Sequence, residues 1–209
     1  KEDATPFATV TAYDYVSAQN ADSAGIPLLL VGDSAAMVIY GLDNTIPISM
    51  DELIFLTRAV CRGVKNALVV ADMPFMSYQT STEDAVRNAG RFVKESGAEA
   101  VKLEGGTAYT SQIKAIMEAG IPVMGHVGLL PQSYHLSSGY RIQGKSKLEA
   151  EKIKEDALAV QDCGAFAVVL EGIPADLAEE ITAMLEIPTI GIGAGPHCDG
   201  QIQVLHDII

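Results

Sequence analysis

The chain has 209 residues, of which 48% are hydrophobic, and this length and composition suit one well-buried domain over residues 1–209 rather than two. Its formal net charge of −13 repels phosphate backbones and anionic lipid headgroups, so neither nucleic acid nor a membrane surface is an expected partner. No apolar run approaches the roughly 20 residues that a membrane span needs, and no signal-peptide pattern opens the chain.

Short, continuous apolar runs recur along the whole chain. Runs of this kind, without polar alternation, are typical of parallel strands that are covered on both faces. They predict eight strands, at residues 8–11, 28–31, 68–71, 100–103, 123–125, 167–170, 189–192 and 202–205.

Segments with helical spacing fill most of the gaps between these strands. Ser49 and Glu52 form a capping-box pattern at the start of one helix. Another helix is expected over residues 82–95 with Val93 on its inward face, and Pro174 is expected as the first residue of a later one. Glycines predict where helices end, namely Gly25, Gly97, Gly120 and Gly164.

Eight strands that alternate with helices predict an α/β fold, the (β/α)8 or TIM barrel. A doubly wound sheet is the competing architecture. The barrel is favoured because no G-x-G-x-x-G follows the first strand and because polar groups are spread over many strand ends. The chain stops at Ile209, just past the eighth strand, so we expect the final helix to be missing from it.

Two connections are longer than turns. Residues 35–48 follow the second strand, and residues 127–146 follow the fifth. Connections of this length in a compact domain are usually lids or binding loops, although a plain surface excursion is the alternative. The second one carries several polar and aromatic side chains, namely Tyr134, His135, Tyr140, Arg141 and Lys145.

Three isolated cysteines, Cys61, Cys163 and Cys198, show no CxxC or mixed Cys/His spacing of a metal site. They are expected to be incidental thiols in a reducing compartment, which predicts a cytoplasmic protein.

Charged or imidazole side chains end five consecutive predicted strands. They are Asp33, Asp72, Lys102, Glu104, His126 and Glu171. In a (β/α)8 barrel the reaction site lies at these carboxyl ends. Lys102 and Glu104 are two residues apart on one strand, so both should face the same space. A single Asp after a strand can simply cap a helix or a turn, but capping alone does not account for five strands.

Several carboxylates with few cysteines or paired histidines describe a hard-cation site. Oxygen ligands suit Mg²⁺ or Mn²⁺ better than Zn²⁺. Mg²⁺ typically takes one or two protein carboxylates and leaves positions for water and substrate. Lys102 adds positive charge near the same space. The pattern therefore favours a small anionic substrate that chelates the metal through adjacent oxygens.

Seven short motifs occur in a specific order along the chain. These are residues 7–14 (FATVTAYD), 31–34 (VGDS), 71–75 (ADMPF), 101–106 (VKLEGG), 125–132 (GHVGLLPQ), 170–171 (LE) and 191–201 (GIGAGPHCDGQ). In this order and spacing they resemble the ketopantoate hydroxymethyltransferase family over nearly the whole chain.

The resemblance implies a reaction that composition does not show. It implies transfer of a one-carbon unit from 5,10-methylenetetrahydrofolate to 3-methyl-2-oxobutanoate, giving 2-dehydropantoate in pantothenate biosynthesis, with Mg²⁺ or a similar cation. It also implies a homo-oligomer, a decamer in this family.

The resemblance also implies roles for individual residues. Asp33 and Asp72 match the metal ligands, and Glu104 matches a third acidic residue of the metal site, acting directly or through water. Glu171 matches the general base. The substrate-binding positions are then Asp33, Ser34, Asp72, Lys102 and His126. His126 either bonds the substrate or a ligand, or is a satisfied interior histidine.

Two other functions compete with this one. The first is an isocitrate lyase or phosphoenolpyruvate mutase type of barrel, which also handles Mg²⁺ and 2-oxo acids; the Lys-Cys-Gly motif of lyase chemistry is absent from the sequence. The second is a non-catalytic, metal-dependent oxo-acid binding protein, which would bind tightly without turnover.

Overall fold

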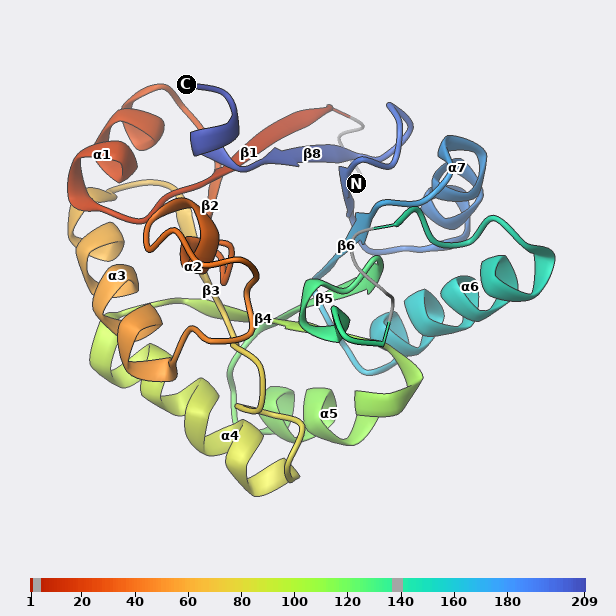
Figure 1. Cartoon of the computed structure of the whole chain (residues 1–209), viewed down its shortest axis with the longest axis horizontal. Helices are drawn as coiled ribbons and strands as arrows, with labels where there is room; N and C mark the ends of the chain where they lie inside the picture. Colours follow the sequence, from red (N-terminus) through yellow and green to blue (C-terminus); the bar gives the residue numbers. More distant parts are fainter. Residues whose placement is uncertain (2–4, 137–140) are drawn as a thin grey trace.

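The structure is a computed structural model that describes residues 1, 5–136 and 141–209. Its centre is a closed barrel of parallel strands in sequence order, in which β1 pairs with both β2 and β8 (Figure 1). The strands are β1 (Phe7–Thr11), β2 (Leu28–Val31), β3 (Leu68–Asp72), β4 (Ala100–Glu104), β5 (Val123–Gly128), β6 (Ala167–Glu171), β7 (Thr189–Ile192) and β8 (Gly200–Gln203). The (β/α)8 barrel predicted from the sequence is therefore confirmed.

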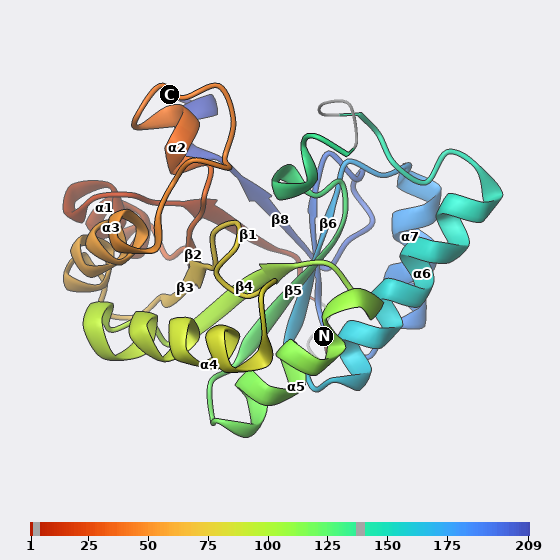
Figure 2. The same ribbon diagram turned by 60° about the horizontal axis from the view of Figure 1, so that its bottom comes forward.

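Helices surround the barrel as an outer layer, except that the short helix at residues 35–38 lies over the carboxyl ends of the strands (Figures 1 and 2). They are α1 (Tyr15–Ser23), α2 (Ala35–Val38), α3 (Met50–Gly63), α4 (Thr82–Arg91), α5 (Thr110–Glu118), α6 (Lys147–Asp162) and α7 (Ala175–Met184), with shorter turns η1 (Phe92–Ser96), η2 (Thr107–Tyr109), η3 (Pro131–Ser133) and η4 (Leu205–Asp207). The capping box of Ser49 and Glu52 begins α3, as expected. None of the described helices is long and apolar enough to cross a membrane.

The last strand differs from the sequence prediction. It begins at Gly200 instead of Ile202, and Leu205 already belongs to the turn η4. Gly200 lies so close to β1 that an added Cβ would stand 2.5 Å from the ring of Phe7. The missing side chain of this glycine allows two backbones and a ring to approach closely.

The inward position of Val93 was predicted wrongly. The helix over residues 82–95 is α-helical only to Arg91 and continues as the π-helical turn η1. A π-turn adds a residue per turn and rotates the following side chains away from their α-helical positions. Phe92 is consequently the fully buried residue, and Val93 is 37% exposed.

Two smaller expectations also change. Pro174 is the N-cap of α7 with ψ of 144°, so the first helical residue is Ala175. The first four residues of the 35–48 connection are the helix α2 instead of loop.

The segment that leads into the amino end of β3 is held by a carboxylate. Asp22, in the last turn of α1, accepts hydrogen bonds from the backbone N–H groups of Lys65, Asn66 and Ala67 at 3.1, 2.9 and 2.8 Å. Those residues lead into β3. This interaction ties α1 to the α3–β3 connection, and it lies at the opposite end of the barrel from the polar strand ends.

Gly125 supplies a stability test of the barrel wall. An added Cβ there would stand 2.3 Å from Cγ1 of Val160 on α6, so Gly125→Ala forces strand and helix apart. We expect a loss of about 1–3 kcal/mol in the free energy of unfolding, the usual cost of overpacking. Urea unfolding measures it.

Gly90→Ala in α4 is the matched control, because its added Cβ would meet no described atom within 4 Å apart from its chain neighbours and the backbone of its own helix. Removing a helical glycine there should stabilise the protein by roughly 0.5–1 kcal/mol. Equal effects of the two substitutions would contradict the packing described for Gly125.

Candidate active site

On several strands, the side chains that face into the barrel change from apolar to polar or charged toward the carboxyl end of the strand. Because side chains two residues apart share a face, each row of these side chains continues from the apolar barrel interior into the cavity above it. The apolar residue and the polar residues that follow it are Val70 and Asp72 on β3, Ala100 with Lys102 and Glu104 on β4, Met124 and His126 on β5, and Val169 and Glu171 on β6. The strand register thus carries these polar side chains into one space.

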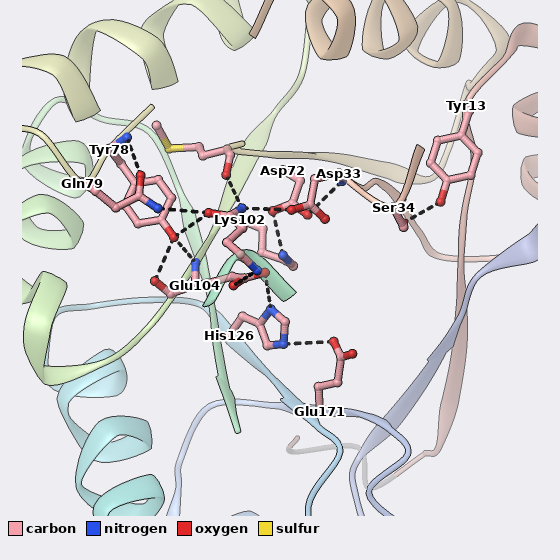
Figure 3. Close-up of polar contacts among 12 residues, drawn as sticks. Tyr13, Asp33, Ser34, Asp72, Tyr78, Gln79, Lys102, Glu104, His126 and Glu171 are labelled. Atoms are coloured by element: carbon pink, nitrogen blue, oxygen red, sulfur yellow. Dashed lines mark hydrogen bonds and ion pairs between the residues drawn. The ribbon is translucent and has the colours of Figure 1, made fainter. Parts of the chain in front are cut away.

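That space is a cavity of about 300 Å³ at the carboxyl ends of the strands. All seven residues predicted from the sequence line it, namely Asp33, Ser34, Asp72, Lys102, Glu104, His126 and Glu171. Figure 3 shows their side chains converging from different strands.

Lys102 is the buried counter-ion of the site. Its Nζ lies 2.6 Å from Oδ1 of Asp72, and both side chains are at most 4% exposed. Oδ2 of Asp72 accepts a hydrogen bond from the backbone N–H of Asp33 at 3.2 Å. Burial lowers the pKa of Lys102, but the charges of Asp72, Glu104 and Asp33 outweigh it and raise the pKa above its ordinary value. Lys102 therefore remains an ammonium ion.

Asp33 and Glu104 are carboxyl groups in surplus over the available positive charge. Burial and then the charge of Asp72 raise the pKa of Asp33 to about 7. Burial and then the charge of Asp33 raise the pKa of Glu104 well above its usual range. Within the described part of the chain, Oε1 of Glu104 has no hydrogen-bond partner. The cavity consequently favours a bound cation.

The donor set fits a hard cation, although it is not an assembled metal site. Among the described residues, no three His, Cys, Asp or Glu side chains form a metal-ligand group. Mg²⁺ needs only one or two protein carboxylates when water and substrate supply the other oxygens. Asp33 and Asp72 meet that requirement, while the metal assignment itself stays a prediction.

His126 lies between two carboxylates. Its Nε2 is 3.1 Å from Oε2 of Glu171, and its Nδ1 is 3.7 Å from Oε1 of Glu104. Burial and then the charge of Lys102 lower the pKa of His126, so the imidazole is neutral at neutral pH. Glu171 is the more accessible partner, since its side chain is 22% exposed and that of His126 only 2%.

Glycines turn the chain away immediately after two of the carboxylates. Gly105 follows Glu104 with φ of 104°, and Gly172 follows Glu171 with φ of 56°. These left-handed conformations strain other residues, so glycine lets each strand end at its functional side chain.

Ser34 is held by a residue that the sequence analysis did not assign. Its Oγ lies 2.8 Å from the phenolic oxygen of Tyr13. Burial raises the pKa of Tyr13 to about 12, so the phenol stays protonated and can hydrogen-bond the serine. Tyr13 lies in the first motif of the family resemblance, which was the available signal.

Both long connections contribute to the cavity wall, as expected of binding loops. Met37, Val38 and Thr45 come from the first, and Leu129 and Pro131 from the second. Tyr140 lies outside the described residues. Gln132 of the second connection is buried and contacts two of the site carboxylates, although the sequence analysis gave it no role.

Solved structures with a similar barrel include a phosphonopyruvate hydrolase and a 2,3-dimethylmalate lyase. A phosphonopyruvate hydrolase in complex with oxalate and Mg²⁺ superposes with a TM-score of 0.75 at 15% identity, covering 99% of this chain and 78% of that one. A 2,3-dimethylmalate lyase of the PEP mutase/isocitrate lyase superfamily gives 0.71 at 18% identity, covering 99% of this chain and 78% of that one. At these identities the likeness shows the fold alone.

Relatives found by sequence are much more similar to this chain than these solved structures are. The 3-methyl-2-oxobutanoate hydroxymethyltransferase of Geobacter sulfurreducens is 60% identical over 200 residues, which cover 96% of this chain and 75% of the relative. The enzyme of the same name from Moorella thermoacetica is 58% identical over 209 residues, covering 100% of this chain and 78% of the relative. The family model for ketopantoate hydroxymethyltransferase matches residues 1–209. The chain therefore belongs to the ketopantoate hydroxymethyltransferase family.

Proposed function

We propose that this chain transfers a hydroxymethyl group from 5,10-methylenetetrahydrofolate to 3-methyl-2-oxobutanoate, giving 2-dehydropantoate, with Mg²⁺ or a similar divalent cation. The observation that carries the proposal is the convergence of all seven predicted residues in one cavity of a barrel from this family. The names of the relatives supply the oxo acid and the transferred group.

Asp33 and Asp72 would hold the cation, with Glu104 joining them directly or through water. When bound, the cation withdraws electrons from the oxo acid and so acidifies its C3 proton. Burial and neighbouring carboxyl groups raise the pKa values of Asp33 and Glu104, and a bound cation would stabilise their ionised forms, which supports this assignment. Lys102 neutralises Asp72 and gives the cavity a fixed positive charge for an anionic substrate.

Glu171 is the base that takes the C3 proton. It is the most accessible of the cavity carboxylates whose contacts are described above, and it stands at the carboxyl end of β6. The neutral His126 beside it orients the carboxylate without neutralising it. Ser34, backed by Tyr13, offers a hydroxyl to the substrate. Once the proton is removed, C3 bonds to the methylene carbon as the bonds from that carbon to the folate nitrogens break. One water supplies the hydroxyl oxygen of the product, and tetrahydrofolate leaves.

Incubation with 3-methyl-2-oxobutanoate, the folate donor and Mg²⁺ tests this function. We expect 2-dehydropantoate to form only when all three are present. A lyase or mutase of the neighbouring superfamily would act on its 2-oxo acid without folate. A binding protein would retain the oxo acid without converting it. Either result would replace the proposed reaction.

We further propose a cytoplasmic enzyme made of one domain over residues 1–209. Cys61, Cys163 and Cys198 are free thiols, which supports a reducing compartment.

Assembly gives a separate prediction. Phe55 on α3 is 69% exposed and Leu148 on α6 is 83% exposed, so apolar side chains are available on the helical exterior. Because the net charge of −13 opposes association, such side chains would have to drive it. We expect a homo-oligomer, a decamer by the family resemblance, when the full-length protein is measured by light scattering. A monomer across the concentration range would contradict this.

A further inference from the structure

Gln132 is a buried amide in a connection, where most side chains are exposed. It lies in the turn η3 after β5, and only 5% of the residue is accessible. It also lines a second cavity of about 200 Å³, whose wall it shares with Glu104 and Tyr78. Because Glu104 lines both cavities, Gln132 lies at the boundary between the second cavity and the active site.

The residue contacts two site carboxylates at once. Its side-chain Nε2 donates to Oδ2 of Asp33 at 3.0 Å, and its backbone N–H donates to Oε2 of Glu104 at 3.0 Å. These bonds join segments that are 99 and 28 residues apart in the sequence. One oxygen of each carboxylate is thereby fixed by a donor on the same residue.

The remaining contacts determine which way the amide points. Nε2 also donates to the carbonyl oxygen of Met73 at 2.9 Å, while Oε1 accepts from Nε2 of Gln79 at 3.0 Å and lies 3.1 Å from the hydroxyl of Tyr78. A flipped amide would put its oxygen against the acceptors of Asp33 and Met73. Figure 3 shows Tyr78 and Gln79, the two partners of the amide oxygen, close to one another on the Glu104 side of the network.

From these contacts we infer that Gln132 is a positioning residue, which holds Asp33 and Glu104 in the orientation that receives the cation. The inference rests on the proposed function, because it assigns the cation to the same carboxylates. Two carboxyl groups that share a buried space disfavour each other's ionised form, which is the form that binds a cation. Donors held by one rigid residue counteract this, as supporting hydrogen bonds do around metal ligands generally.

Gln132→Met tests the role, since methionine is similar in length and apolar but has no donor for Asp33. We expect cation affinity to fall about 10–100-fold, the usual effect of removing a group that orients a metal ligand. Titration calorimetry with MnCl₂ or MgCl₂ alone, without substrate or folate, measures this directly. The matched control is Gln143→Met in the same connection, because the side-chain amide of Gln143 donates only to the carbonyl of Arg141 among the described contacts.

A second readout separates positioning from packing. In the exchange of the C3 hydrogen with D₂O, the Mg²⁺ concentration for half-maximal rate should rise about 10–100-fold in Gln132→Met. The rate at saturating Mg²⁺ should stay within about threefold of wild type, because the base Glu171 is untouched. A residue that only packs the loop would alter thermal stability without this split between cation affinity and maximal rate.

If Gln132→Met does not fold, Gln132→Asn decides the question, because asparagine keeps an amide but is one methylene too short to reach Asp33. Wild-type cation affinity in a folded variant overturns the inference. Absence of cation binding in the wild-type protein overturns the proposed function instead, so the two failures are distinguishable.

Discussion

Glu171→Gln is expected to slow exchange of the C3 hydrogen of 3-methyl-2-oxobutanoate into D₂O by about 10²–10⁴-fold, the usual contribution of a positioned base. Glutamine has nearly the same shape and can still contact His126, but it cannot accept the C3 proton. Cation and oxo acid should therefore bind with affinities close to wild type. NMR of the exchange without folate isolates proton removal from one-carbon transfer.

The alternative role for Glu171 predicts a different result. A carboxylate placed just before α7 can merely complement the helix dipole, worth less than about 1 kcal/mol. Glu171→Gln would then exchange at the wild-type rate, and His126, 3.1 Å away, would become the candidate base. Glu179→Gln on the exposed surface of α7 is the matched control, since its side chain is 64% exposed.

Asp33→Ala and Asp72→Ala should each abolish metal-dependent binding of the oxo acid while the barrel stays folded. Each substitution removes a proposed oxygen ligand from a cavity that has only a few. The apolar barrel interior below the cavity does not depend on either side chain. Titration calorimetry of the oxo acid with and without Mg²⁺ measures the loss, and far-UV circular dichroism checks the fold.

The two variants differ in whether Lys102 keeps its ion pair. Asp72→Ala removes the carboxylate 2.6 Å from Lys102, whereas Asp33→Ala leaves that ion pair in place. Asp162→Ala at the exposed end of α6 should change nothing and serves as the control. Unchanged metal-dependent binding in both active-site variants would refute the metal assignment.

The strand pattern allowed most of the site to be predicted. An apolar run that ends in a charged residue can be recognised in a single sequence. Residues two apart on a strand share a face, so Ala100, Lys102 and Glu104 are expected on one side of β4. The barrel then brings the ends of such runs together. Two strands, β2 and β7, have the predicted bounds, and others extend one or more residues further, to residues such as Asp72 and Glu171.

The parts that sequence reasoning missed depend on contacts without a local pattern. Gln132 reaches Asp33 across 99 residues of sequence, and no periodicity marks it as buried. Tyr13 likewise meets Ser34 only once β1 and β2 are paired. The π-helical turn at Phe92 follows residues with ordinary helical spacing, so the spacing does not mark where the helix type changes. Burial in loops and local changes of helix type are tertiary effects that one-dimensional patterns do not record.

The hydrogen bonds that Asp22 accepts from residues 65–67 have an evolutionary consequence. They strengthen the barrel at the end remote from the cavity, where an exchange of residues alters folding stability without moving a catalytic atom. Substitutions at that end are therefore limited by folding stability alone, whereas substitutions at the rim around Asp33 and Glu171 also alter the proposed active site. Among relatives, variation should accordingly concentrate at the end of the barrel that Asp22 holds.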